Sequence, residues 1–210
     1  MGINLRKGQK IDLTKGEPGL SAVMVGLGWD EAQKTNNNGG FLKGFFGSKE
    51  SEEDIDCDAS VILLGGDGKL YDSQDINASL VYYNNLIHYS DAIIHQGDNR
   101  TGEGEGDDEQ IFVDLNRVPQ DVSRLVFVVN IYEADKRKQH FGMIENAFIR
   151  LVNVKSNHEI CRYNLSDNYD GMTGLVVGEI YRYQGEWKFN AIGQPVRDAS
   201  YITSLVNLYS

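Results

Sequence analysis

Apolar residues in this chain recur at every second position, and this alternation restricts the possible fold more than any other feature of the sequence. In the segment 22–29 the apolar side chains on one side of an extended backbone are Val23, Val25, Leu27 and Trp29. Such a period, or a short apolar run bounded by turn residues, is typical of β-strands. Eight segments show it, namely Ala22–Trp29, Ala59–Leu64, Ile111–Leu115, Leu125–Tyr132, Ala147–Val154, Glu159–Leu165, Leu175–Tyr183 and Trp187–Ile192.

Turns rich in glycine and aspartate separate several of these segments. The stretches 65–68 and 168–171 both contain residues that accept a positive φ. Many short strands without long helical crossovers favour an all-β fold, specifically an antiparallel β-sandwich of two sheets with short peripheral helices. The length of 210 residues suits a single domain over 1–210.

Two peripheral helices are predicted, at Asp135–Ile144 and at Asp198–Leu208, with Asp198 as the capping residue of the second. The apolar face of the second helix consists of Ile202, Leu205, Val206 and Tyr209. The stretch 35–54 has no sustained periodicity, and we interpret it as an irregular loop insertion. Its aromatic residues are expected to dock onto the body of the domain, because grouped aromatics seldom stay in water: Phe41, Phe45 and Phe46.

The charge balance argues against several classes of function. Thirty-one acidic and 20 basic residues give a net charge of -11, which repels phosphate backbones and anionic lipids. No apolar run approaches the roughly 20 residues of a membrane-spanning helix, and the N-terminal residues are too polar for a secretion signal. Only two cysteines occur, Cys57 and Cys161, far apart, as expected of reduced thiols. Cys57 is interpreted as a packing residue and not as a nucleophile, because the neighbouring Asp56 and Asp58 would raise the pKa of its thiol. We therefore expect a cytoplasmic protein that binds neither nucleic acid nor membrane.

The segment 98–109 concentrates acidic residues and glycines directly before a predicted strand. Two like charges about 4 Å apart repel by about 4 kcal/mol at an effective dielectric constant of 20, so a folded loop of this composition needs a cation. Gly102 and Gly104 would let backbone carbonyls turn inward, which favours calcium over magnesium. Arg100 and Glu103 occupy positions that rule out an EF-hand. A solvated acidic surface loop is the alternative interpretation.

Two further clusters support a cation site. Asp54, Asp56 and Asp58 alternate, so their side chains point to one side of an extended chain. Asp167 and Asp170 lie in a predicted loop between two strands, where Asx-turns explain them equally well.

Several segments, in this order, resemble the tellurium-resistance TerD family: 2–10, 26–30, 56–60, 98–109 and 164–167. The resemblance covers nearly the whole chain. It implies a cytoplasmic bacterial protein of tellurite and general stress resistance, with a two-sheet β-sandwich whose loops at one end bind two calcium ions. The ligands that the resemblance implies are Asp56, Asp58, Asp98, Asn99, Asp107, Asp108, Glu109 and Asp167, with backbone carbonyls near Gly102 and Gly104.

Other chemistry has less support in the sequence. The four histidines show no metal-ligand spacing, and His95 is interpreted as a packed imidazole in preference to an acid-base group. A metal-dependent hydrolase acting on a phosphoester is the alternative function, because paired carboxylates can hold a reactive water. Only Arg100 is close in sequence to stabilise such a reaction. We therefore expect no enzyme, but a calcium-loaded adaptor that binds other stress-resistance proteins.

Overall fold

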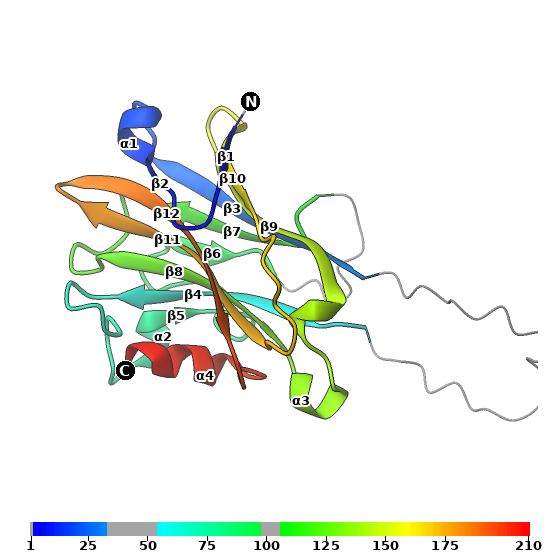
Figure 1. Ribbon diagram of the computed structural model, residues 1–210. Coiled ribbons are helices and arrows are strands. Elements are labelled where there is room, and N and C mark those ends of the chain that lie inside the picture. The colour runs from blue at the N-terminus through cyan, green and yellow to red at the C-terminus, as the bar shows by residue number, and fades with distance from the viewer. Residues whose placement is uncertain (1, 33–53, 98–105) are drawn as a thin grey trace, which may run out of the picture.

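The computed structural model describes residues 2–32, 54–97 and 106–210, which form two six-stranded sheets packed face to face (Figure 1). The first sheet has the order β1 (Ile3–Leu5), β10 (His158–Asn164), β9 (Ile144–Asn153), β3 (Ala22–Glu31), β7 (Glu109–Asp114) and β6 (Ile93–His95). The second has the order β2 (Lys10–Asp12), β12 (Glu186–Val196), β11 (Gly174–Tyr183), β8 (Arg124–Ile131), β4 (Cys57–Leu64) and β5 (Leu80–Val81). The predicted all-β sandwich is thereby confirmed.

Each of the eight predicted strands is present, as β3, β4 and β7 to β12, with ends displaced by a few residues. The sequence analysis missed β1, β2, β5 and β6, which are only two or three residues long and too short to show an alternation. All strand pairs are antiparallel except β1 with β10, which is parallel.

The core lies between the sheets, where the predicted apolar face of β3 packs against inward side chains of β8 and β12 such as Phe127 and Phe189, both fully buried. A second, smaller apolar cluster lies on the outer face of the second sheet. There the helix α4 (Ile202–Val206) covers side chains of β4, β8 and β11, including Ile62 and Val128 (Figure 1).

The helix predicted at Asp135–Ile144 is wrong in extent. Helix α3 covers only Ala134–Arg137, because Lys138 adopts a left-handed conformation with φ 56° and ends it. A 3-10 turn follows at Phe141–Met143, and Ile144 already opens β9, where it pairs with Glu31. Strand pairing therefore replaces the second half of the predicted helix.

The C-terminal helix is also shorter than predicted. Asp198 has φ 57° and lies outside the helix, so it does not act as the cap; Tyr201 precedes the first helical residue. A 3-10 turn at Asn207–Tyr209 follows α4. The predicted apolar face is correct in that Ile202, Leu205 and Val206 are buried.

Residues 35–53 of the predicted insertion, with the three phenylalanines expected to dock, lie outside the described residues. Two other short helices complete the described chain, α1 (Leu13–Gly16) and α2 (Ile76–Ser79). Within the described residues, no helix combines the length and the apolar character needed to cross a membrane.

The packing of α4 predicts that two leucines of the C-terminal segment contribute very differently to the free energy of unfolding. Leu205 is fully buried and Leu208 is 48% exposed. We expect Leu205→Ala to lower the free energy of unfolding by about 2–5 kcal/mol because it leaves a cavity, whereas Leu208→Ala changes it by less than about 0.5 kcal/mol. Urea denaturation followed by circular dichroism measures both, and equal losses would contradict the packing described.

Candidate functional site

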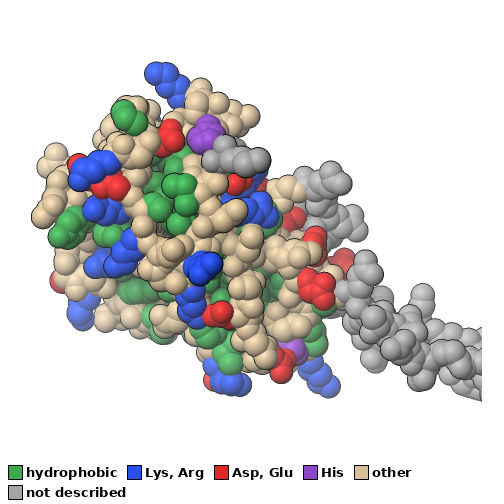
Figure 2. Space-filling view, turned by 45° about the horizontal axis from the view of Figure 1, so that its top comes forward, with side chains coloured by type: hydrophobic (Ala, Val, Ile, Leu, Met, Phe, Trp, Pro, Cys, Tyr) green, Lys and Arg blue, Asp and Glu red, His purple; other side chains and the backbone are tan. Residues whose placement is uncertain are grey.

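Four carboxylates from the two sheets lie close enough to Cys57 for their charges to act on its thiol. Asp56 and Asp58 flank Cys57 at the start of β4, in the second sheet, and Asp108 and Glu109 lie at the start of β7, in the first. Burial raises the pKa of the Cys57 thiol, and the negative charges of Glu109, Asp58, Asp56 and Asp108 raise it further. Several acidic side chains lie close together at one side of the molecule, and others are scattered over the same face among basic side chains (Figure 2).

Glu109 links the sheets at this end. Its Oε2 accepts a hydrogen bond from the backbone N–H of Ala59 in β4 at 2.8 Å and lies 3.4 Å from Nε2 of His95. The same His95 nitrogen is 3.1 Å from the carbonyl oxygen of Ala59. Both side chains are almost fully buried. They contact the backbone N–H and C=O of Ala59, a residue of β4 that lies beyond the end of the short neighbouring strand β5. His95 is thus a packed imidazole, as predicted.

Asp58 shares its face of the second sheet with a buried polar residue, Asn130, that the sequence analysis did not identify. It is 5% exposed and pairs in register with Asn130 of β8, so the two side chains share that face. Asn130 is 1% exposed, and its Oδ1 has no hydrogen-bond donor among the described residues. An asparagine within the apolar run 125–131 is the signal that could have identified this buried oxygen.

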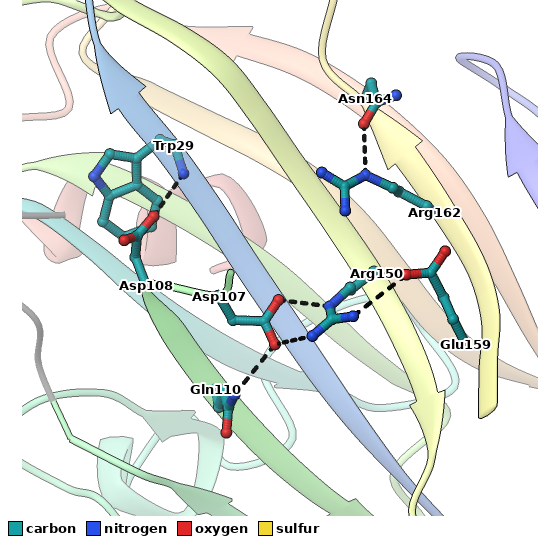
Figure 3. A network of polar contacts seen from close by, with 8 residues as sticks. All are labelled: Trp29, Asp107, Asp108, Gln110, Arg150, Glu159, Arg162 and Asn164. Carbon is teal, nitrogen blue, oxygen red and sulfur yellow. Dashed lines mark hydrogen bonds and ion pairs between the residues drawn. The ribbon is translucent and has the colours of Figure 1, made fainter. Parts of the chain in front are cut away.

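Asp107 forms the strongest ion pair near the acidic end (Figure 3). Its Oδ1 lies 2.6 Å from Nε of Arg150 in β9 and its Oδ2 lies 2.8 Å from Nη2, a bidentate contact made across β3. The Asp107 side chain is 0% exposed. Gly26 of β3 lies beneath it, and a Cβ there would collide with the carboxylate. Arg150 also contacts Glu159 at 3.4 Å.

Asp108 is held by the backbone of β3. Its Oδ2 accepts the N–H of Trp29 at 2.7 Å (Figure 3). Burial raises the pKa of the Asp108 carboxyl, the Trp29 hydrogen bond opposes the rise, and the charges of Asp30 and Asp107 add to it. The carboxylate form of Asp108 is therefore disfavoured by its surroundings unless a cation compensates.

Asp167 occupies a different position from the carboxylates around Cys57. It lies in the loop between β10 and β11 and forms an ion pair of 2.5 Å with Lys7, both side chains being about half exposed.

The remaining predicted ligands, Asp98, Asn99, Gly102 and Gly104, lie outside the described residues. Within the described ranges no group of three or more His, Cys, Asp or Glu side chains is arranged to hold a metal ion. The described donors are carboxylate and amide oxygens, which suit a hard divalent cation in type.

Both cysteines are free and buried. Burial is the main cause that raises the pKa of Cys57, and it raises the pKa of Cys161 to about 12. Thiols in such surroundings are poor nucleophiles and poor reductants. The interpretation of Cys57 as a packing residue is confirmed.

These features define a class of protein, a two-sheet β-sandwich with carboxylates gathered at one end. The sequence matches the TerD domain over residues 1–209. It is 50% identical to the stress response protein SCP2 of Bacillus subtilis (strain 168) over 198 residues, 94% of each chain. It is 41% identical to the tellurium resistance protein TerD of Serratia marcescens over 194 residues, 92% of this chain and 91% of that one. The chain belongs to the TerD family.

A solved structure agrees in fold. The crystal structure of a TerD homologue from Streptomyces coelicolor A3(2) superposes with a TM-score of 0.65 at 18% sequence identity, covering 91% of this chain and 99% of that one. At this identity the similarity concerns the fold alone.

The buried ion pair of Asp107 with Arg150 and the exposed ion pair of Asp167 with Lys7 should contribute differently to stability. Arg150→Met leaves the Asp107 carboxylate buried without its cation, and we expect a loss of about 3–5 kcal/mol in the free energy of unfolding. Lys7→Met removes the exposed pair with Asp167 and should cost about 0–1 kcal/mol. Thermal and urea denaturation compare the two variants, and a loss at Lys7 as large as that at Arg150 would contradict this assignment.

Proposed function

We propose that this protein is a calcium-binding module of a bacterial stress- and tellurite-resistance system. Two calcium ions bind the acidic end of the sandwich, order its loops and so present a surface to other stress-resistance proteins. The observation that carries this proposal is that the charges of Asp56, Asp58, Asp108 and Glu109, which come from two different sheets, all act on the one buried thiol of Cys57.

The energetics at this end favour a bound cation. Carboxylates brought together in a partly buried site repel one another by several kcal/mol, and desolvation adds to that cost. The raised pKa of Asp108 is one sign of this cost. Two calcium ions would offset four of the eleven net negative charges of the chain, and binding to the folded state alone would stabilise it by mass action.

The ligand set follows from chemistry and position. Asp56, Asp58, Asp108 and Glu109 supply anionic oxygens, and the amide oxygen of Asn130 faces the same region as Asp58. Asp98 and Asn99, with carbonyls near Gly102 and Gly104, would complete the shells. Asp107 and Asp167 are already paired with Arg150 and Lys7, so a ligand role for either requires its ion pair to open.

The role of the protein in resistance would be indirect. Its relatives are named for stress response and tellurium resistance. Direct reduction of tellurite by this chain would need an accessible low-pKa thiol, whereas both cysteines are buried with raised pKa values. A binding function, in which calcium shapes the contact surface, is consistent with the four carboxylates and needs no reactive cysteine.

Calorimetric titration of the metal-free protein with calcium tests the proposal. We expect a heat change with a stoichiometry near two and a rise in the melting temperature, because the cation relieves repulsion between carboxylates. Asp58→Asn should weaken binding at one site at least about tenfold, since it removes a charged oxygen from the cluster. Magnesium in excess should compete poorly, because it requires a tighter and more hydrated shell.

The control variant is Asp121→Asn, which removes an exposed aspartate from another part of the chain and should leave calcium binding unchanged. No heat change at millimolar calcium would contradict the proposal. Calcium-dependent turnover of phosphoester substrates by the wild-type protein would favour the hydrolase alternative instead.

A further inference from the structure

One side of the sandwich is closed by the segment 82–92, which connects β5 in the second sheet to β6 in the first. Residues 86–88 of this segment pair with β6. The N–H of His88 donates to the carbonyl of Ile93 at 3.0 Å, and the N–H of His95 donates to the carbonyl of Leu86 at 2.8 Å. Ile87 and Ile94 are therefore directly opposite each other in an antiparallel bridge. The stretch 86–88 thus forms the outermost edge of the first sheet.

This edge presents unpaired backbone groups. In a bridge with these two hydrogen bonds, the N–H and C=O of the central residue, Ile87, point away from β6. No residue in the described ranges hydrogen-bonds to either group. The Ile87 side chain is 53% exposed. Ile87 therefore lies on an edge strand that can form backbone hydrogen bonds with one further strand.

Contacts within the chain fix the backbone on both sides of Ile87 in the absence of a partner. The Asn85 side-chain amide donates to the carbonyls of Asn77 and Leu80 at 3.0 and 2.7 Å. The ring of His88, fully buried, lies 2.7 Å from Oγ of Ser90 and 3.0 Å from the carbonyl of Ala78. Because these contacts fix the backbone on both sides of Ile87, pairing there would cost little conformational entropy.

The edge also lacks the protection that natural edge strands usually carry. Such strands are normally guarded against association by charged residues, proline or bulges. Residues 76–90 contain no Lys, Arg, Asp, Glu or Pro, and the charge that follows them, Asp91, is paired with Arg117 at 2.9 Å. By contrast, β2 carries Lys10 and Asp12, and β1 is followed by Arg6 and Lys7. The large apolar side chains exposed along 76–90, besides Ile87, are Ile76, Tyr83, Leu86 and Tyr89.

We propose that this edge is a self-association surface, on which a second copy of the chain pairs antiparallel through residues 86–88. A two-fold axis passes beside Ile87, so each Ile87 N–H donates to the Ile87 carbonyl of the other copy and the two first sheets become continuous. Such an interface is isologous and closes after two chains.

Charge limits where a second copy can approach. Two copies, each with a net charge of -11, repel over most of their surfaces and can approach most easily across an uncharged edge. A cationic partner would be attracted to the acidic end of the sandwich instead. The five exposed side chains amount to an area on the order of 500 Å², below the roughly 800 Å² per partner of a standard interface, so the dimer should be weak.

Sedimentation velocity of the full chain in calcium-containing buffer, from micromolar to near-millimolar concentration, tests this proposal. The mass should rise from 23.5 kDa toward twice that value with concentration. Added salt should strengthen the association, because it screens the repulsion between the two net charges. Ile87→Lys should weaken the association at least about tenfold, since it places two like charges against each other across the axis.

The matched control is Ile3→Lys, on the edge strand β1, where the side chain is 55% exposed, close to the value at Ile87. This variant should associate like the wild type. Hydrogen exchange gives a second readout, in which the Ile87 amide is protected more strongly as the concentration of the protein rises. Circular dichroism verifies that both variants remain folded.

Three results would overturn the proposal. The wild-type chain could remain a monomer at the highest concentration, or Ile87→Lys could associate as strongly as the wild type. In the third, the Ile87 amide gains protection only when an extended peptide of another sequence is added, which assigns the edge to a different partner.

Discussion

Repulsion between carboxylates at one end of the sandwich is the constraint on which the arrangement of this molecule depends. The protein offsets part of it with its own groups. Asp107 has the guanidinium of Arg150, Asp108 has the N–H of Trp29, and Glu109 has the N–H of Ala59. Three different partners, from both sheets, thus hold three consecutive acidic residues in place. A divalent cation among the acidic oxygens would supply the remaining positive charge.

The glycines of β3 make this arrangement possible. Asp107 lies directly over Gly26, and the carbonyl of Gly106 would be 2.8 Å from a Cβ at Gly28. A Cβ at Gly26 would displace the Asp107 carboxylate, and a Cβ at Gly28 would collide first with the Phe148 ring. The acidic segment can therefore lie flat on β3 and reach Arg150, which belongs to the strand on the other side. Close approach of backbone and carboxylate explains these glycines better than any requirement of a turn.

The acidic end and the uncharged edge are neighbours. Burial raises the pKa of the Tyr83 hydroxyl, and the charges of Asp58 and Asp56 add to that rise, so this residue of the edge segment is close to the carboxylates. The proposed cation site and the proposed self-association surface are therefore close to each other at Tyr83. The proposed calcium and self-association sites rest on different residues, and each can be tested by variants that leave the other intact.

Local patterns in the sequence determined the strands that contain enough residues to alternate, the buried face of α4 and the packing roles of Cys57 and His95. The resemblance to the TerD family named Asp56, Asp58, Asp108 and Glu109 as calcium ligands, and this role stays a prediction. The sequence did not show that Asp107 pairs with Arg150, 43 residues away, or that Asn130 lies opposite Asp58. Strand register decides such contacts, and register depends on the packing of both sheets at once. The limits of α3 and the edge at Ile87 were also decided by tertiary pairing, because a single turn or a three-residue strand is too short to be specified by its own residues.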